Sequence, residues 1–164
     1  MPTPISHAAV GYAIGAWSPH DAPSLTQRVC LAAAACAMLP DIDVIGFAPH
    51  RAITHSILFE VLAGLVAALV LFRGTEPRTR RVIALTLVIA ALSHSCFDAL
   101  SRYSLGIEFF APFSDARYRF PWTPLGRPDN EVMAQLVQEA FVVFLPAMIV
   151  AWLGLRLRHR TQTA

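Results

Sequence analysis

Long apolar runs alternate with short polar stretches along this chain of 164 residues. Apolar runs at residues 29–39, 57–72 and 82–100 predict membrane helices, and a further helix is predicted from about 130 to 155, where an amphipathic start becomes apolar. The short run 4–18 falls below the roughly 20 residues that cross a bilayer, so it predicts a tilted or partly inserted helix. Together these runs predict an all-α, polytopic membrane helix bundle of four to five helices.

The composition agrees with a membrane protein. Hydrophobic residues make up 55% of the chain and charged residues 15%, with a mean hydropathy of +0.52. A net charge of +2 gives no reason to expect a nucleic-acid partner. The length fits a single membrane-embedded domain, residues 1–164. Cys30, Cys36 and Cys96 lie in apolar runs without Cys-x-x-Cys spacing, which predicts small buried residues rather than disulfides or a thiolate zinc site.

Two polar islands interrupt the apolar runs. The first island contains two acids and two imidazoles, namely Asp41, Asp43, His50 and His55. The second places His94 four residues before Asp98 near the end of a predicted helix, so both side chains share one helical face. Ionisable groups are expensive near hydrocarbon, and their presence there indicates function.

Arginine is biased toward one face of the predicted bundle. If every apolar run crosses once, Arg28, the loop 73–81 and the tail 156–160 share a face, while five other arginines lie opposite. The positive-inside rule makes the first face cytoplasmic, the C-terminus included. A set of histidine and acidic side chains that interrupt or flank the apolar runs then lies at the external, periplasmic face. They are His7, Asp41, Asp43, His50, His55, His94, Asp98 and Glu139. A single site at the outer interface is the economical interpretation.

Carboxylate and imidazole donors together suit zinc, manganese or iron. His94 and Asp98 could give two ligands to an ion, or form a hydrogen-bonded pair that reaches a neighbouring helix. Asp41 and Asp43 could be ligands or could cap the helix that ends near Pro40. Because one Asp suffices for a cap, we interpret at least one of the two as a ligand.

The remaining polar residues of the site also have two interpretations each. His7, His50 and His55 are interpreted as further metal ligands, with a hydrogen-bonded or interfacial histidine as the alternative. Arg51 could bind a phosphate through its planar fork or anchor the chain at headgroup level. Glu139 could be a further ligand or a general base, or it could favour the helix N-terminal dipole.

The motifs in their order along the chain resemble one family. They are His7, Pro-Asp-Ile-Asp at 40–43, His-Arg-x-x-Thr-His-Ser at 50–56, His-Ser-x-x-Asp at 94–98 and Pro-Phe-Ser at 112–114. Over most of its length the chain resembles the YdjM-like family of LexA-regulated, inner-membrane, metal-dependent hydrolases of bacteria. That family is in turn similar to the all-helical zinc-dependent phospholipase C and P1 nuclease group.

The resemblance implies a ligand set. His55, His94, Asp98 and one of Asp41 or Asp43 would hold a central ion, and His7 would help Asp98 to hold another. The phospholipase group also uses a late His-x-x-x-Glu, and here the first position of that motif is Gln135. Gln is a poor zinc ligand, so one or two zinc ions are expected rather than three, with manganese or iron as other candidates.

The resemblance also implies an activity, the hydrolysis of a phosphoester in a membrane lipid or a lipid-linked phosphate at the outer interface of the inner membrane. Arg51 would neutralise developing charge, and Asp41, Asp43 or Glu139 would accept the proton. The aromatic-rich connection 101–130 is expected to lie at the membrane interface and cover the site. Two other classes remain open, a metal-ion transporter, whose ligands are expected nearer the bilayer midplane, and a non-catalytic metal-binding scaffold.

Overall fold

The computed structural model describes residues 2–20, 22–45, 52–102, 106–126 and 132–163. The helices are α1 (Pro4–Ala16), α2 (Thr26–Met38), α3 (Ile57–Leu71), α4 (Pro77–Ala99), α5 (Val132–Glu139) and α6 (Leu145–Thr163), with a π-helical turn, η5 (Ala140–Phe144), joining the last two. Short 3₁₀ segments are η1 (Pro23–Leu25), η2 (Leu39–Ile45) and η3 (Ile53–His55). In these ranges extended pairing is limited to two isolated bridges. The predicted all-α bundle is confirmed.

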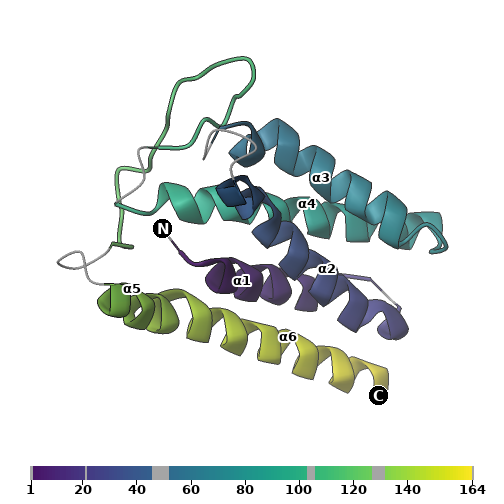
Figure 1. Ribbon diagram of the computed structural model, residues 1–164. Helices are drawn as coiled ribbons and strands as arrows, with labels where there is room; N and C mark the ends of the chain where they lie inside the picture. Colours follow the sequence, from purple (N-terminus) through teal and green to yellow (C-terminus); the bar gives the residue numbers. More distant parts are fainter. Residues whose placement is uncertain (1, 21, 46–51, 103–105, 127–131, 164) are drawn as a thin grey trace.

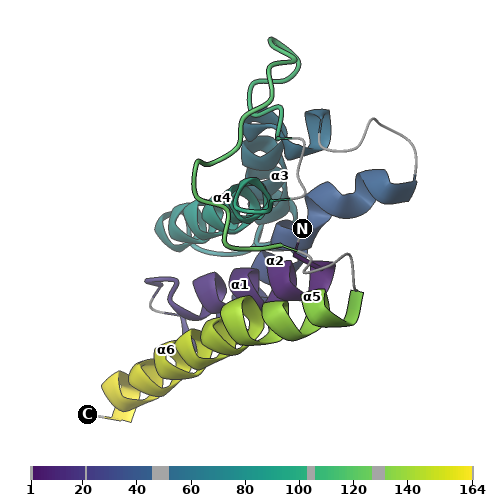
Figure 2. The ribbon, with the colours of Figure 1, turned by 90° about the vertical axis from the view of Figure 1, so that its left-hand side faces the viewer.

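The helices lie side by side, and α1 occupies the middle of the bundle (Figure 1). It packs against α2, α4 and α6, while α3 packs mainly on α4. The start of α1, the end of α4 and the start of α5 lie at one end of the bundle, and the C-terminus lies at the other (Figure 1). Figure 2 looks onto the first end, where η2, η3 and the loop after α4 also lie. We call this end of the bundle the site end.

Among the described residues, three helical stretches are long and apolar enough to cross a membrane, Pro23–Asp43, Pro77–Ala99 and Val132–Arg158. The first is longer than the apolar run 29–39, because η1 and η2 extend α2 at both ends. By contrast, α3 has 15 residues, or about 23 Å of helix against a hydrocarbon core of about 30 Å. It begins only after Ser56, whose side chain caps it by accepting a hydrogen bond from Phe59 N at 3.2 Å.

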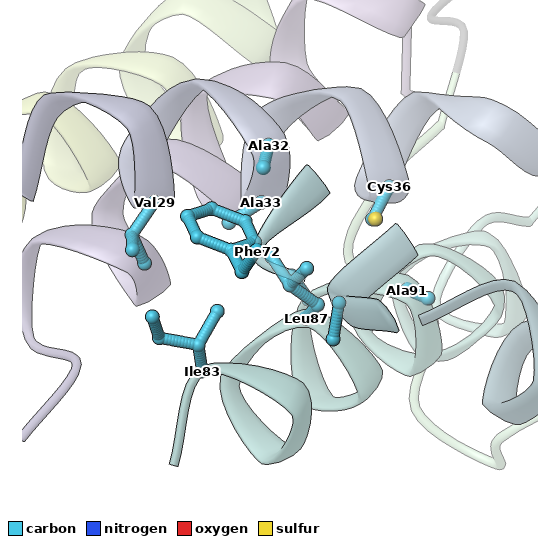
Figure 3. Packing of buried hydrophobic residues seen from close by; sticks show 10 residues of the cluster. Val29, Ala32, Ala33, Cys36, Phe72, Ile83, Leu87 and Ala91 are labelled. Carbon is cyan, nitrogen blue, oxygen red and sulfur yellow. The ribbon is translucent and has the colours of Figure 1, made fainter. Parts of the chain in front are cut away.

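Small side chains set the distances between the helices. A β-carbon on Gly11 would lie 2.4 Å from Ala33 O, and one on Gly15 would lie 2.6 Å from Cys30 Cα. Only glycine therefore permits the close contact of α1 with α2. The main core then forms where α2, α3 and α4 meet, with Phe72 among smaller apolar side chains (Figure 3).

Backbone hydrogen bonds hold the loop after α4 in place. Ile107 and Tyr118 exchange backbone hydrogen bonds of 2.9 Å, and Ile57 N donates to Phe109 O at 3.0 Å, which fixes the loop to the start of α3. Phe113 and Trp122 are 84% and 71% exposed. Exposed aromatic side chains at the end of a membrane bundle fit the expected interfacial position.

One prediction about the cysteines is wrong. Cys30 and Cys36 are buried in the packed faces of α2, as expected, but Cys96 is exposed. It occupies α4 between the buried residues Ser95 and Asp98, so its side chain points away from the face that they share. An apolar neighbourhood in sequence does not determine which side of a lipid-facing helix packs inward.

Candidate metal centre

Local structure brings four segments to the site end. Pro40 has no N–H to continue α2, and the chain changes there to the 3₁₀ turns of η2, which carry Asp41 and Asp43. His55 closes η3, immediately before the cap of α3. His94 and Asp98 lie one turn apart in α4, and His7 lies in the second turn of α1. Each of these side chains is buried, with Asp41 the most exposed at 9%.

Five of the side chains form one cluster. The Nε2 atoms of His55 and His94 are 3.1 Å apart, and His94 Nε2 lies 3.6 Å from Asp41 Oδ1. Asp98 bridges two rings, with Oδ1 at 3.4 Å from His7 Nε2 and Oδ2 at 3.8 Å from His55 Nε2. The rings of His7 and His94 stack with centroids 3.9 Å apart. We refer to these five residues, which are candidate metal ligands, as the metal cluster.

Hydrogen bonds on the far side of the rings set the tautomers. His94 Nδ1 donates to Ala37 O at 2.7 Å, so in the neutral ring Nε2 carries a lone pair. The Thr54 hydroxyl donates its one hydrogen to Asp43 Oδ2 at 2.8 Å, so at 3.1 Å it accepts from His55 Nδ1. Two Nε2 lone pairs therefore face each other. This repulsive contact becomes favourable when a cation lies between the two nitrogens.

The separations fit a transition-metal ion. Ligand atoms about 2.1 Å from a tetrahedral zinc ion lie about 3.4 Å from one another, and the four contacts of the metal cluster lie between 3.1 and 3.8 Å. In the part of the chain that the structure describes, two overlapping groups of donors are close enough to share an ion: His7, Asp41 and His94, and His55, His94 and Asp98. The donor set of imidazole and carboxylate suits zinc, manganese or iron.

Asp43 has a different position from the other predicted ligands. Its Oδ2 lies 3.4 Å from His55 Nδ1, the ring nitrogen on the far side from Asp98. Together with Thr54 it orients the His55 ring, as carboxylates commonly orient metal-binding histidines. Sequence reasoning gave no role to Thr54, although its place directly before His55 was visible in the motif.

Ser95 was also missed, and it joins three elements beside the metal cluster. Its hydroxyl lies 2.6 Å from Glu60 Oε1 of α3 and 2.9 Å from the carbonyl oxygen of His55. Glu60 is 1% exposed. The contact links α4 to α3 and to η3, so it helps to fix the backbone that carries His55.

Glu139 lies outside both donor groups. Its Oε2 accepts from Thr3 N at 2.6 Å and from Ser6 Oγ at 3.1 Å, and its Oε1 accepts from Gln135 Nε2 at 2.7 Å. The carboxylate therefore fastens the start of α1 to the end of α5. This arrangement favours a structural role over the predicted role as ligand or general base. His50 and Arg51, also predicted for the site, lie outside the described residues.

The fold and the cluster define a class, a helical membrane protein with a buried group of histidine and aspartate side chains. The family model described as YdjM inner membrane protein matches residues 1–162, and the chain belongs to this family. It is 31% identical to Inner membrane protein YbcI of Escherichia coli (strain K12), over 92% of this chain and 95% of that protein. No solved structure matches the chain.

Proposed function

We propose that this protein is a metal-dependent hydrolase that cleaves a phosphoester of a membrane lipid or a lipid-linked phosphate. The observation that carries the proposal is the pair of facing Nε2 atoms of His55 and His94, 3.1 Å apart, with both rings held from behind by hydrogen bonds. Zinc is the first candidate, as one or two ions, with manganese or iron as the others. When bound, the ion supplies Lewis acidity and lowers the pKa of a coordinated water to about 7.

The chain's own residues then have separate tasks. Hydrogen bonds hold the buried rings of His55 and His94, and buried His7 lies 3.4 Å from Asp98, so these four residues fix the reacting geometry. Asp41 is the most exposed acid of the metal cluster, at 9% against 0% for Asp98. A group that exchanges protons with solvent needs such access, so we assign the general base to Asp41 rather than to Glu139.

Metal content and turnover test the proposal together. Purified wild-type protein, prepared without chelator, is expected to hold one or two equivalents of metal and to hydrolyse a member of a panel of phospholipids and lipid-linked phosphates. His94→Ala and Asp98→Ala should lose both. Ser93→Ala, which removes only a hydroxyl bonded to Ala90 O on the same helix, should keep both. Turnover retained by His94→Ala would overturn the assignment, and metal without any turnover would support the scaffold function.

We also propose that the metal cluster faces the periplasm and that the C-terminus is cytoplasmic. The arginines of residues 73–81 and of the tail lie at the end opposite the metal cluster, as the positive-inside rule requires. Single cysteines replacing Asp115, in the loop at the site end, and Gly74, in the turn at the other end, test this in a Cys96→Ser background. A membrane-impermeant maleimide should label only the Asp115→Cys protein in intact spheroplasts. Labelling of Gly74→Cys alone would reverse the orientation.

A further inference from the structure

A groove of about 520 Å³ lies between α1, α4 and the helix formed by η5 and α6. Its walls carry Val10 and Ile14 from α1, Ile89 and Phe97 from α4, and Val142 from η5. The volume lies in the range of sites that bind small molecules, about 300–1,000 Å³. Because its walls are helices of a membrane bundle, the groove is reached from the bilayer rather than from water.

The polar groups at the far end of the groove already have partners. The hydroxyls of Ser18 and Thr86 lie 2.8 Å apart, and Thr86 also donates to Val82 O at 3.0 Å. The indole N–H of Trp17 donates to Val150 O at 2.8 Å and so ties α1 to α6. A polar ligand would find these groups satisfied, so the lining fits an apolar occupant.

The groove runs along the helices toward the site end, where α4 ends. Phe97 precedes Asp98 in α4, and Val10 follows His7 by one turn of α1. From Phe97 to Thr86 the lining of α4 extends over eleven residue steps, or about 16.5 Å. Half of a bilayer's hydrocarbon core is about 15 Å thick. The groove therefore has the length and direction of one acyl chain hanging from a headgroup at the site end.

The π-helical turn shapes one wall of the groove. Pro146 has no N–H to donate to Val142 O, and η5 ends directly before this stretch of α6. Both residues and Val143 line the groove. Such turns are rare and frequently occur at functional sites.

We propose that this groove holds one acyl chain of a membrane phospholipid whose phosphate lies at the metal cluster. The inference rests on the proposed function and narrows it, because it selects a phospholipid with a long acyl chain over a lipid-linked phosphate. A second groove of about 400 Å³ lies between α1, α2 and α6 and is lined by Tyr12, Met148 and Trp152, among others. It receives no residue from α4, the helix of His94 and Asp98, so it serves as the control.

Photo-crosslinking of the full chain in proteoliposomes tests the inference. The probe is phosphatidylglycerol with a diazirine near the end of one long acyl chain, and the crosslinked peptides are identified by mass spectrometry. Peptides containing Ile89 and Val150 should be labelled severalfold above the exposed Leu65 of α3, which reports bulk lipid. Val142→Phe should reduce the groove labelling severalfold. Met148→Phe should not, although Met148, in the second groove, has an exposed fraction similar to that of Val142. Groove labelling no higher than that of α3, or unaffected by Val142→Phe, would overturn the inference.

Hydrolysis measured beside crosslinking separates the two proposals. If both hold, Val142→Phe raises the KM for a long-chain phospholipid more than for its short-chain analogue, and Met148→Phe leaves the two KM values in their wild-type ratio. Groove labelling in a metal-loaded protein that hydrolyses no phospholipid supports the groove and overturns the hydrolase. Hydrolysis without groove labelling supports the hydrolase and overturns the groove.

Discussion

The hydroxyl of Thr54 offers a direct test of the metal cluster, because it touches His55 but not the space between the ligands. Thr54→Val keeps the shape of the side chain and removes both the acceptor for His55 Nδ1, at 3.1 Å, and the donor to Asp43, at 2.8 Å. Loss of a group that orients a ligand typically weakens metal affinity about 10–100-fold, or about 1.4–2.7 kcal/mol. Asp43 Oδ2 lies 3.4 Å from the same nitrogen and can accept its hydrogen after a small shift. We therefore expect the lower end, about tenfold.

Competition with a chromophoric chelator in detergent measures this change as a ratio of zinc dissociation constants. The matched control is Thr86→Val, which also removes a buried hydroxyl with two hydrogen bonds, but in the groove rather than beside a ligand. Both variants should lose stability by about 1 kcal/mol, while only Thr54→Val weakens zinc. Unchanged affinity in Thr54→Val, or an equal loss in both variants, would refute the argument that hydrogen bonds behind His55 organise the site.

Three further changes test the packing, the Glu139 contact and a helix cap. Gly11→Ala places a β-carbon 2.4 Å from Ala33 O and should cost about 1–3 kcal/mol of unfolding free energy, whereas Gly74→Ala, with nothing within 4 Å, should leave the melting temperature unchanged. Glu139→Gln should destabilise by about 1–3 kcal/mol but keep the wild-type metal content in elemental analysis, and loss of metal would instead make Glu139 a ligand. Backbone N–H groups at the start of α4 lower the pKa of Glu76 below 4.5, so its stabilisation is complete above that pH and is lost as pH falls through the lowered pKa. The melting temperature of Glu76→Gln should thus lie below that of wild type at pH 7 and converge with it as the pH falls through the lowered pKa, and a difference that stays constant over that range would exclude the cap.

Much of the fold and of the site could be predicted from the sequence because both depend on where polar groups interrupt apolar runs. A charged or polar side chain in a lipid-facing stretch is costly, so its position in the chain alone indicates a packed or functional site. If each apolar run crosses the membrane once, His7, Asp41, His94 and Asp98 lie at the same end of the bundle, and the structure brings them together in the metal cluster. The four-residue step from His94 to Asp98 needed only helical geometry.

Contacts between segments that are distant in sequence could not be read from the chain. The Ala37 carbonyl of α2 accepts from the His94 ring of α4, 57 residues away, only because the two helices pack together. Periodicity likewise does not show that Glu139, 136 residues from Thr3, binds the start of α1. The sequence by itself determined the apolar helices and the kinds of candidate ligand they carry, because residue chemistry and spacing suffice for both. The tertiary structure alone decided which atoms face one another, because ring tautomers, buried partners and the groove beside the site are properties of helices packed together.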